Sequence, residues 1–211
     1  MKAFKTPLII VLALVFAATG GLAAHFLTDR TVGTPDTEAV ILEQPRLIPD
    51  RILLDHHGSA WSPKRLEGQW TLIFFGFTHC PDICPETMVV INQAHRMIEE
   101  NGKALPPSVV FISVDPARDT PERLANYVPY FNQSFLGVTG DQEDIEELAS
   151  AMAVPLQIPD VDPDQDYEVD HGSQLILVGP DGHIRAFFTA PHHPRQIAQD
   201  YEAIVRYLNP S

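Results

Sequence analysis

Residues 71–85 read TLIFFGFTHCPDICP, and this stretch decides the fold prediction. The apolar run 72–77 is typical of a strand that is buried on both faces. Cys80 and Cys84 follow shortly after it, and they are the only cysteines in the sequence. Pro85 suits the first position of a helix, because its ring holds φ near the helical value. The stretch therefore predicts a strand, a cysteine loop and a helix in succession.

Two cysteines on one short loop can form a disulfide or hold a soft metal ion. We expect the unpaired N–H groups and the dipole of the following helix to favour the thiolate form of Cys84. The alternative is two buried thiols or a static disulfide, although so small a ring would remove little entropy from the unfolded chain. In an exported protein the pair would be oxidised by default, so a working dithiol would need a reducing partner.

The composition fits one globular domain with an appendage, because 45% of the 211 residues are hydrophobic and 20% are charged.

Lys2 and Lys5 precede the uncharged apolar stretch 7–24, which at about 1.5 Å per residue nearly spans a bilayer core of roughly 30 Å. We expect residues 1–27 to be an uncleaved membrane anchor, with the lysines in the cytoplasm and the domain outside. A cleavable signal peptide is the alternative, since Gly21-Leu22-Ala23 fits a small-x-small cleavage site.

The polar, turn-rich residues 28–47 are interpreted as a tether to a domain at residues 48–211. A formal net charge of −14 argues against nucleic-acid binding, which needs basic clusters. Because the chain has no long Arg-rich presequence, we expect the anchor in a bacterial inner membrane and the domain in the periplasm.

Beyond the cysteines, helical and strand patterns alternate. We expect a helix that ends at Asn101-Gly102, a short helix at 121–127 that Pro129 stops, and two further amphipathic helices around 145–152 and 197–208. The predicted strands are 109–114, 135–138, 175–178 and 184–188, with the turn Pro180-Asp181-Gly182 joining the last two, and a small N-terminal hairpin involves 52–55 and 70–77. Residues 155–170 show no clear period. The order predicts an α/β, thioredoxin-like fold with a central mixed sheet flanked by helices.

Three motifs resemble those of the Sco/SenC family, the thioredoxin-like copper proteins of cytochrome c oxidase assembly. They are FFGFTHCPDICP at 74–85, SVDPARDTP at 113–121 and YEVDH at 167–171, and the resemblance runs in the family's order from about residue 52 to residue 208. It implies that Cys80, Cys84 and His171 bind copper. Thiolates suit Cu(I), and an imidazole nitrogen completes three-coordination or serves Cu(II). In such a sheet the loop of His171 lies across from the first strand–helix turn.

The sequence departs from the family pattern at two places near His171. Gly172 stands where the family often has serine, so we expect the local backbone contacts to differ. Residues 155–159 replace an expected aromatic stretch, which leaves the conformation of that loop open. Neither departure changes a predicted ligand.

Other candidate residues have structural interpretations. We expect His79 to pack, or to support the ligands without binding the metal itself, because adjacent side chains on an extended segment diverge. The pairs His56-His57 and His192-His193 are expected on surface loops, with a transient metal-loading role as the alternative. We expect Asp82 to be exposed and His95 to lie at the core boundary. The remaining candidates are Met88, Met97 and Met152 as core residues, and Asp115 and Asp119, which order a loop and cap the helix after it.

As the resemblance implies, we expect a copper-binding assembly factor rather than an enzyme. It would deliver copper to, or prepare the thiols of, the dinuclear copper centre of cytochrome c oxidase subunit II. An exported thiol–disulfide oxidoreductase that uses Cys80 and Cys84 as redox-active thiols is the alternative, as is a redox or copper sensor. His171 separates these hypotheses, because disulfide exchange needs no imidazole there. The expected partners are subunit II, a thioredoxin-type thiol reductant, another periplasmic copper chaperone, and the membrane through the N-terminal helix.

Overall fold

The structure is a computed structural model that describes residues 34–159, 162 and 167–209. Its strands are β1 (Val40–Arg46), β2 (Leu53–Asp55), β3 (Ala60–Trp61), β4 (Thr71–Gly76), β5 (Ser108–Ser113), β6 (Leu136–Thr139), β7 (Leu156–Gln157), β8 (Asp170–His171), β9 (Leu175–Val178) and β10 (Ile184–Phe188). Its helices are the 3-10 turn η1 (Pro63–Leu66) and the α-helices α2 (Ile83–Asn101), α3 (Pro121–Phe131), α4 (Gln142–Ala151) and α5 (Pro194–Leu208).

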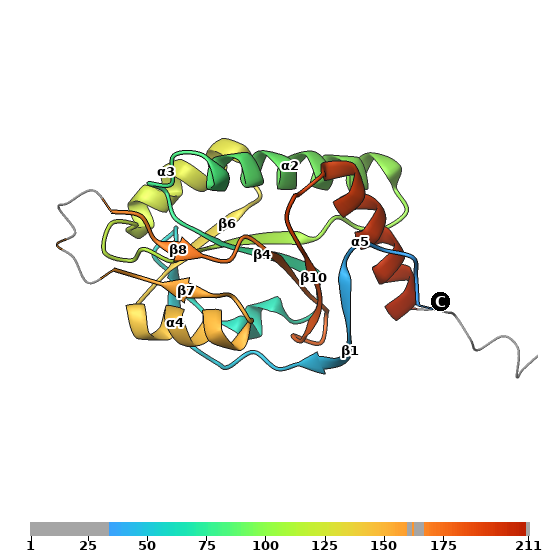
Figure 1. The fold of residues 1–211 in the computed structure, drawn as a ribbon, viewed down its shortest axis with the longest axis horizontal. Coiled ribbons are helices and arrows are strands. Elements are labelled where there is room, and N and C mark those ends of the chain that lie inside the picture. The colour runs from blue at the N-terminus through green and yellow to red at the C-terminus, as the bar shows by residue number, and fades with distance from the viewer. Residues whose placement is uncertain (1–33, 160–161, 163–166, 210–211) are drawn as a thin grey trace, which may run out of the picture. The chain divides into compact units, whose positions relative to one another are not determined.

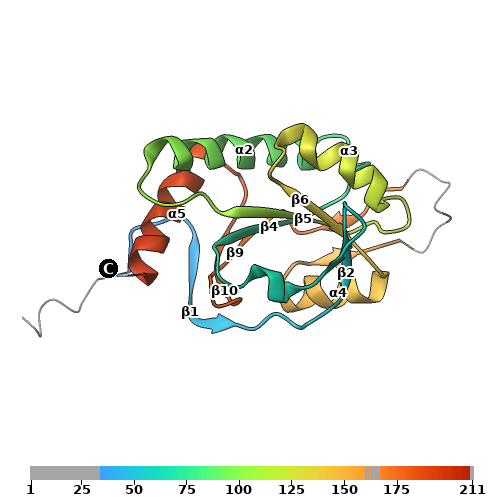
Figure 2. The same ribbon diagram turned by 180° about the vertical axis from the view of Figure 1, so that it is seen from behind.

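From Thr37 onward the chain forms one compact unit around a mixed sheet. In the described residues this sheet has eight strands in the order β1-β10-β9-β4-β5-β6-β2-β3, and β7 pairs with β8 separately. Figures 1 and 2 show α2 and α3 on one face of the sheet and α4 on the other, while α5 packs against α2. The predicted thioredoxin-like α/β fold, with a mixed central sheet and flanking helices, is confirmed.

Strand β4 lies at the centre of the sheet. It pairs in parallel with β5 along all six of its residues and antiparallel with β9. All six residues are buried, because helices cover both faces and an apolar run supplies both sets of side chains. The predicted burial of this strand on both faces is confirmed. Its carboxyl end therefore delivers the cysteine loop to a fixed position at one edge of the sheet.

The N-terminal boundary differs from the predicted tether at 28–47. Residues 40–46 form β1, which pairs antiparallel with β10. Asp200 on α5 is 3% exposed, and its carboxylate accepts hydrogen bonds of 3.1 Å from the backbone N–H groups of both Glu38 and Ala39. Most side chains of β1 are exposed, so the strand has no alternating apolar pattern from which it could be predicted.

Several element boundaries also differ. Helix α2 begins at Ile83, so Pro85 occupies its third position rather than its first. Helix α3 continues through Pro129 to Phe131. The proline removes one backbone hydrogen bond but does not end the helix at once. The N-terminal hairpin joins β2 to β3 and does not involve β4.

None of the helices in the described part of the chain is long and apolar enough to cross a membrane. The anchor predicted for residues 1–27 lies outside that part.

The role of β1 can be tested by truncation. A chain that starts at Thr34 should unfold at the temperature of the full chain, whereas one that starts at Ile48 should unfold about 5 °C lower. The shorter chain loses the partner strand of β10, and the buried carboxylate of Asp200 loses two donors, which costs about 1–3 kcal/mol. Thermal unfolding followed by circular dichroism measures the difference. Equal midpoints would show that β1 does not stabilise the domain.

Candidate metal centre

Both cysteines lie where β4 turns into α2. Cys84 is fully buried at the second position of α2, while Cys80 is half-buried in the preceding loop, and both are free thiols. The backbone N–H of Cys84 donates to Cys80 Sγ at 3.4 Å. The start of the helix therefore provides a hydrogen-bond donor to the outer sulfur.

Gly76, the last residue of β4, leaves room for the inner sulfur. A Cβ atom at this position would lie 3.2 Å from Cys84 Sγ and 2.8 Å from the ring of Phe111. The second distance is shorter than carbon atoms tolerate without movement, so any larger residue would push the ring or the helix away. The glycine is therefore a packing requirement of the buried thiol.

His171 approaches the inner sulfur from β8, 87 residues later in the sequence. Its Nε2 lies 3.6 Å from Cys84 Sγ, within range of an S–H···N hydrogen bond, and its Nδ1 lies 3.0 Å from the carbonyl oxygen of Gly172. Because Nδ1–H donates to that carbonyl, the lone pair of Nε2 faces the thiol. The rings of Phe74 and Phe77 pack against the imidazole. The proximity predicted for His171 and the cysteine loop is present.

Burial governs the protonation of both groups. Burial raises the pKa of the Cys84 thiol far above its ordinary value, and a hydrogen bond from the backbone of Phe77 opposes this only in part. The expected thiolate at Cys84 is therefore wrong, because loss of water outweighs the helix dipole at a fully enclosed sulfur. Burial also lowers the pKa of His171, which keeps the imidazole neutral at neutral pH.

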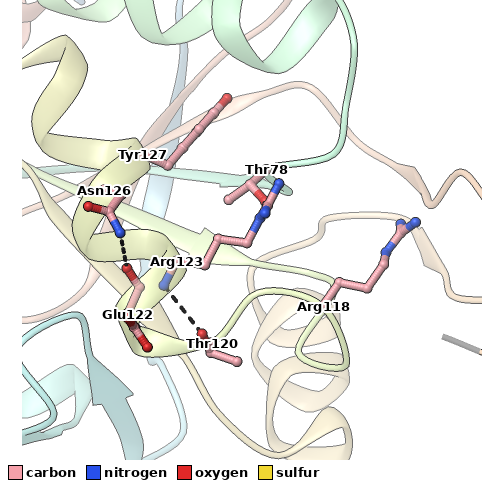
Figure 3. A pocket seen from close by; sticks show the side chains of 7 residues that line it. All are labelled: Thr78, Arg118, Thr120, Glu122, Arg123, Asn126 and Tyr127. Atoms are coloured by element: carbon pink, nitrogen blue, oxygen red, sulfur yellow. Dashed lines mark hydrogen bonds between the residues drawn. The ribbon is translucent and has the colours of Figure 1, made fainter. Parts of the chain in front are cut away.

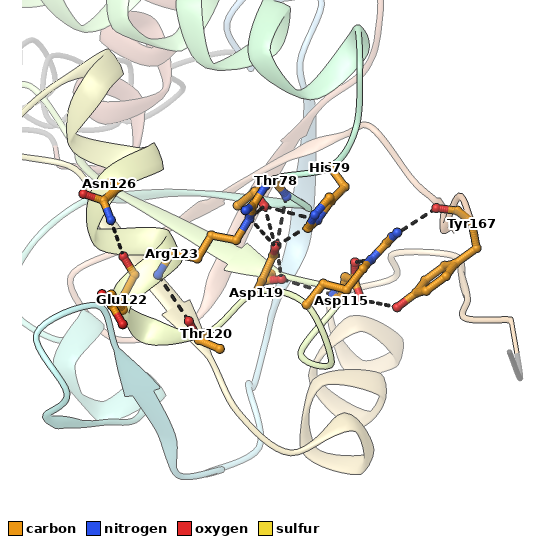
Figure 4. A network of polar contacts seen from close by, with 11 residues as sticks. Thr78, His79, Asp115, Asp119, Thr120, Glu122, Arg123, Asn126 and Tyr167 are labelled. Atoms are coloured by element: carbon orange, nitrogen blue, oxygen red, sulfur yellow. Dashed lines mark hydrogen bonds and ion pairs between the residues drawn. The ribbon is translucent and has the colours of Figure 1, made fainter. Parts of the chain in front are cut away.

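Asp119 ties the cysteine loop to the loop after β5. It is fully buried, and its carboxylate accepts a hydrogen bond from the backbone N–H of Thr78 at 2.9 Å (Figure 4). Ser113 Oγ donates to the same carboxylate at 2.7 Å. The Thr78 hydroxyl donates to its other oxygen at 2.5 Å. The cap of α3 is instead Thr120, whose hydroxyl accepts from the N–H of Arg123. Asp119 thus orders the loop as predicted but does not cap the helix.

Asp115 ties the segment before His171 to the same loop. Its buried carboxylate accepts hydrogen bonds from the Tyr167 hydroxyl at 2.6 Å and from Arg118 Nε at 2.5 Å. The Arg118 guanidinium lies 3.5 Å from the centre of the Tyr167 ring and also donates to the Tyr167 carbonyl. Burial and the Asp115 carboxylate raise the pKa of Tyr167 to about 12, so the phenol remains a donor. One loop, residues 114–120, therefore holds both segments that carry the predicted ligands.

An open pocket of about 580 Å³ lies beside the cysteine loop and does not include the three predicted ligands. Figure 3 shows Thr78, Arg123 and Tyr127 around it. The Tyr127 hydroxyl is buried and has no hydrogen-bond partner among the described residues. Burial raises its pKa. It is an O–H donor near the sulfurs that the sequence did not reveal, because its position in α3 is typical of an ordinary helix residue.

His79 faces the β5–α3 loop. Its Nδ1 lies 3.7 Å from Asp119, and together with Asp115 the three residues bring donor atoms within 4.8 Å of one another. Each oxygen of the two carboxylates already accepts at least one hydrogen bond from Thr78, Ser113, Arg118 or Tyr167, so a metal would have to compete with these donors. His79 is exposed, so the structure gives it a contact with the buried Asp119 rather than a packed position. Asp82 is exposed, as expected.

One histidine of each pair differs from the expected surface residues, whereas His57 and His193 are exposed as expected. His56 is buried, and its Nδ1 accepts from the N–H of Gly137 at 3.0 Å, so its Nε2–H donates to His57 at 3.1 Å. This hydrogen bond leaves no free nitrogen on His56 for metal loading.

His192 is half-buried and donates to the carbonyl of Ser173 at 2.7 Å. The remaining candidates lie as expected: His95 against Phe135 at the core boundary, Met97 packed on the core, and Met88 and Met152 within it.

The two departures from the family pattern contact each other. Gly172 N–H donates to the Pro155 carbonyl at 2.8 Å, and a Cβ at residue 172 would lie 2.8 Å from Pro155 Cδ and 2.3 Å from the Gln174 side chain. Glycine permits this close approach, and β7 then pairs with β8 so that Leu156 stands opposite His171. The altered residues thus bring β7 beside β8, the strand that carries the histidine.

Comparisons with known proteins agree with the motifs. The SCO1/SenC family model matches residues 42–206. A Stutzerimonas stutzeri protein described as a candidate copper-binding protein is 37% identical over 164 residues, which cover 77% of this chain and 79% of that protein. The mitochondrial SCO2 homolog of Bos taurus is 36% identical over 190 residues, covering 90% and 71%. The crystal structure of Arabidopsis thaliana ScoI with copper bound matches with a TM-score of 0.71 and 33% identity, covering 76% of this chain and 99% of that one.

The difference between the two thiols can be tested by alkylation. The variant Cys84→Ser retains only Cys80, and Cys80→Ser retains only Cys84. At pH 7 iodoacetamide should modify the first variant at least tenfold faster, because the thiol of Cys84 is buried and protonated. The alkylation rate of Cys80→Ser should rise about tenfold per pH unit, because at pH values below the pKa of Cys84 each unit raises the thiolate fraction about tenfold. In urea, as a control, both variants should react alike. Equal rates in the folded proteins would contradict this account.

Proposed function

The chain belongs to the SCO1/SenC family, and we propose that it binds one copper ion through Cys80, Cys84 and His171. It delivers this copper to, or prepares the thiols of, the dinuclear copper centre of cytochrome c oxidase subunit II. The observation that carries the proposal is the orientation of His171, whose Nε2 faces Cys84 Sγ at 3.6 Å while Nδ1 is held by Gly172. Disulfide exchange does not require such an imidazole.

The donor set fits copper. Two thiolates suit the soft Cu(I) ion, and a neutral imidazole nitrogen adds a third ligand that Cu(II) also accepts. The hydrogen bond from Nδ1–H to a backbone carbonyl fixes the ring orientation, as it does for most metal-binding histidines. The similarity to ScoI, which has been crystallised with copper bound, supports copper rather than another soft metal.

The two sulfurs have different tasks in this proposal. Cys80 is half-buried and meets incoming copper first, whereas the enclosed Cys84 and His171 complete the site. The proton between Cys84 Sγ and His171 Nε2 must leave when copper binds, because the thiolate is the ligand. Burial raises the pKa of Cys84, so copper competes with that proton at neutral pH. Affinity for Cu(I) therefore increases as pH rises.

The cellular setting follows from the sequence. Residues 1–27 anchor the chain in a bacterial inner membrane, and the domain faces the periplasm. The cysteines need a reductant of the thioredoxin type there, because that compartment oxidises exposed dithiols. A second periplasmic copper chaperone supplies the metal.

A thiol–disulfide oxidoreductase is the second candidate, and one contact favours it. The hydrogen bond from the Cys84 backbone N–H holds Cys80 Sγ in place, and this sulfur is the more exposed of the two, as access for an attacking thiol requires. This activity can coexist with copper delivery, because both the donor and the acceptor of copper need reduced thiols.

The variant His171→Ala separates the two activities. It should lower Cu(I) affinity about tenfold or more and abolish the Cu(II)–thiolate absorption, because the nitrogen ligand is lost, while disulfide exchange with an oxidised peptide stays near the parent rate. Cys80→Ser and Cys84→Ser should each abolish tight copper binding in a chelator competition. His193→Ala, which removes an exposed imidazole, is the matched control and should bind copper like the parent protein.

Oxidase activity in cells decides which activity matters. Cells that carry His171→Ala at the parent protein level should fail to assemble the oxidase. Full oxidase activity without added copper would contradict copper delivery and leave thiol reduction as the function.

A further inference from the structure

The first turns of α2 expose apolar side chains next to the cysteine loop. Ile83 is 51% exposed and Val89 is 44% exposed, although both are large and apolar. Tyr130 on the neighbouring α3 is 84% exposed. Figures 1 and 2 show α2 and α3 side by side on the same face of the sheet. Exposed apolar side chains that gather in one place mark interaction sites more often than scattered ones do.

Two grooves flank these turns of α2. The groove between α2 and α3 has a volume of about 980 Å³ and is lined by Val89, Tyr130 and Phe131, together with Pro81 of the cysteine loop. A groove of about 620 Å³ lies on the other side, where Ile83 faces Pro191 and His192. Glu86 and Val90 line both grooves, so the two form one surface across the start of α2.

The charge of this surface has one sign. Asp82 and Glu86 are exposed acids that line the larger groove, and Glu86 also lines the smaller one. No lysine or arginine is among the described residues that line either groove. The surface therefore suits an apolar segment that carries a lysine or arginine beside it.

We propose that this surface, centred on Glu86, Val89 and Tyr130, docks the copper-accepting domain of oxidase subunit II through an apolar segment flanked by a basic residue. The inference rests on the proposed function, because it names the partner surface for the same copper site. The surface is continuous with the site itself, since Pro81 and Asp82 lie between the two cysteines and also line the groove.

Docking here explains how a largely buried site can exchange metal. Cys84 is enclosed and only Cys80 is partly accessible, so an acceptor must approach from the side of the loop that carries Cys80. Cu(I) then passes from Cys80, Cys84 and His171 to two thiolates of the acceptor without a change of oxidation state. The acceptor thiols release two protons, and the vacated cysteines take up two, so charge and protons balance.

The test compares copper binding with copper transfer. Full-length protein in detergent, loaded with Cu(I), is mixed with the soluble copper-free domain of subunit II, and the second-order transfer rate is measured. Val89→Glu and Tyr130→Ser should lower this rate at least tenfold and leave Cu(I) affinity, measured with a chelator, within twofold of the parent. Leu105→Glu is the matched control and should transfer copper within twofold of the parent rate. Leu105 is apolar and 87% exposed, but it lies before the amino end of β5, whereas the cysteine loop lies near the carboxyl end.

A second variant tests the charge. Glu86→Lys should slow transfer and reduce its dependence on salt, because the acid would no longer attract a basic partner. Unchanged transfer by Val89→Glu and Tyr130→Ser overturns the docking proposal, and so does a parent protein that holds copper tightly but transfers none. A parent dimer that Val89→Glu converts to a monomer without slowing transfer would assign the surface to a second copy of the chain. Failure of the parent to bind copper at all would instead overturn the proposed function.

Discussion

Two buried carboxylates on one loop hold the candidate metal centre together. Asp119 binds the cysteine loop through the backbone and hydroxyl of Thr78, and Asp115 binds the segment before His171 through Tyr167 and Arg118. A buried carboxylate is costly unless its oxygens are satisfied, so each one requires its partners as much as it positions them. The loop follows β5, which pairs with β4 along its whole length. The sheet thereby fixes the distance between residues that lie far apart in the sequence.

The same packing gives the two sulfurs different properties. Gly76 and the Phe111 ring enclose Cys84, whereas Cys80 lies on the loop at the protein surface. Enclosure disfavours the thiolate and makes the inner thiol a donor to His171, so the site is ordered before any metal arrives. A preorganised site loses little conformational entropy on binding. Enclosure also limits access to the inner sulfur, which is why we propose a docking surface beside Cys80.

Much of the fold could be predicted, because its centre obeys simple patterns. The apolar β4, the Gly102 stop of α2 and the β9–β10 hairpin follow from burial, left-handed glycine and turn chemistry. Strand β1 could not be predicted, since its pairing with β10 uses backbone atoms and leaves most side chains exposed. The approach of His171 to Cys84 was predicted from fold and motif. The raised pKa of Cys84, and the Tyr127 hydroxyl that finds no partner in the described part of the chain, depend on three-dimensional enclosure, which no local pattern encodes.

The central claim is that Cys80, Cys84 and His171 form one copper site. X-ray absorption at the copper edge of the Cu(I)-loaded protein tests it most directly, because it identifies the atoms bound to the metal. The account predicts two sulfur ligands and one nitrogen ligand in the parent protein, and two sulfurs without that nitrogen in His171→Ala. A parent spectrum with sulfur ligands alone, or a nitrogen ligand that persists in His171→Ala, would contradict it.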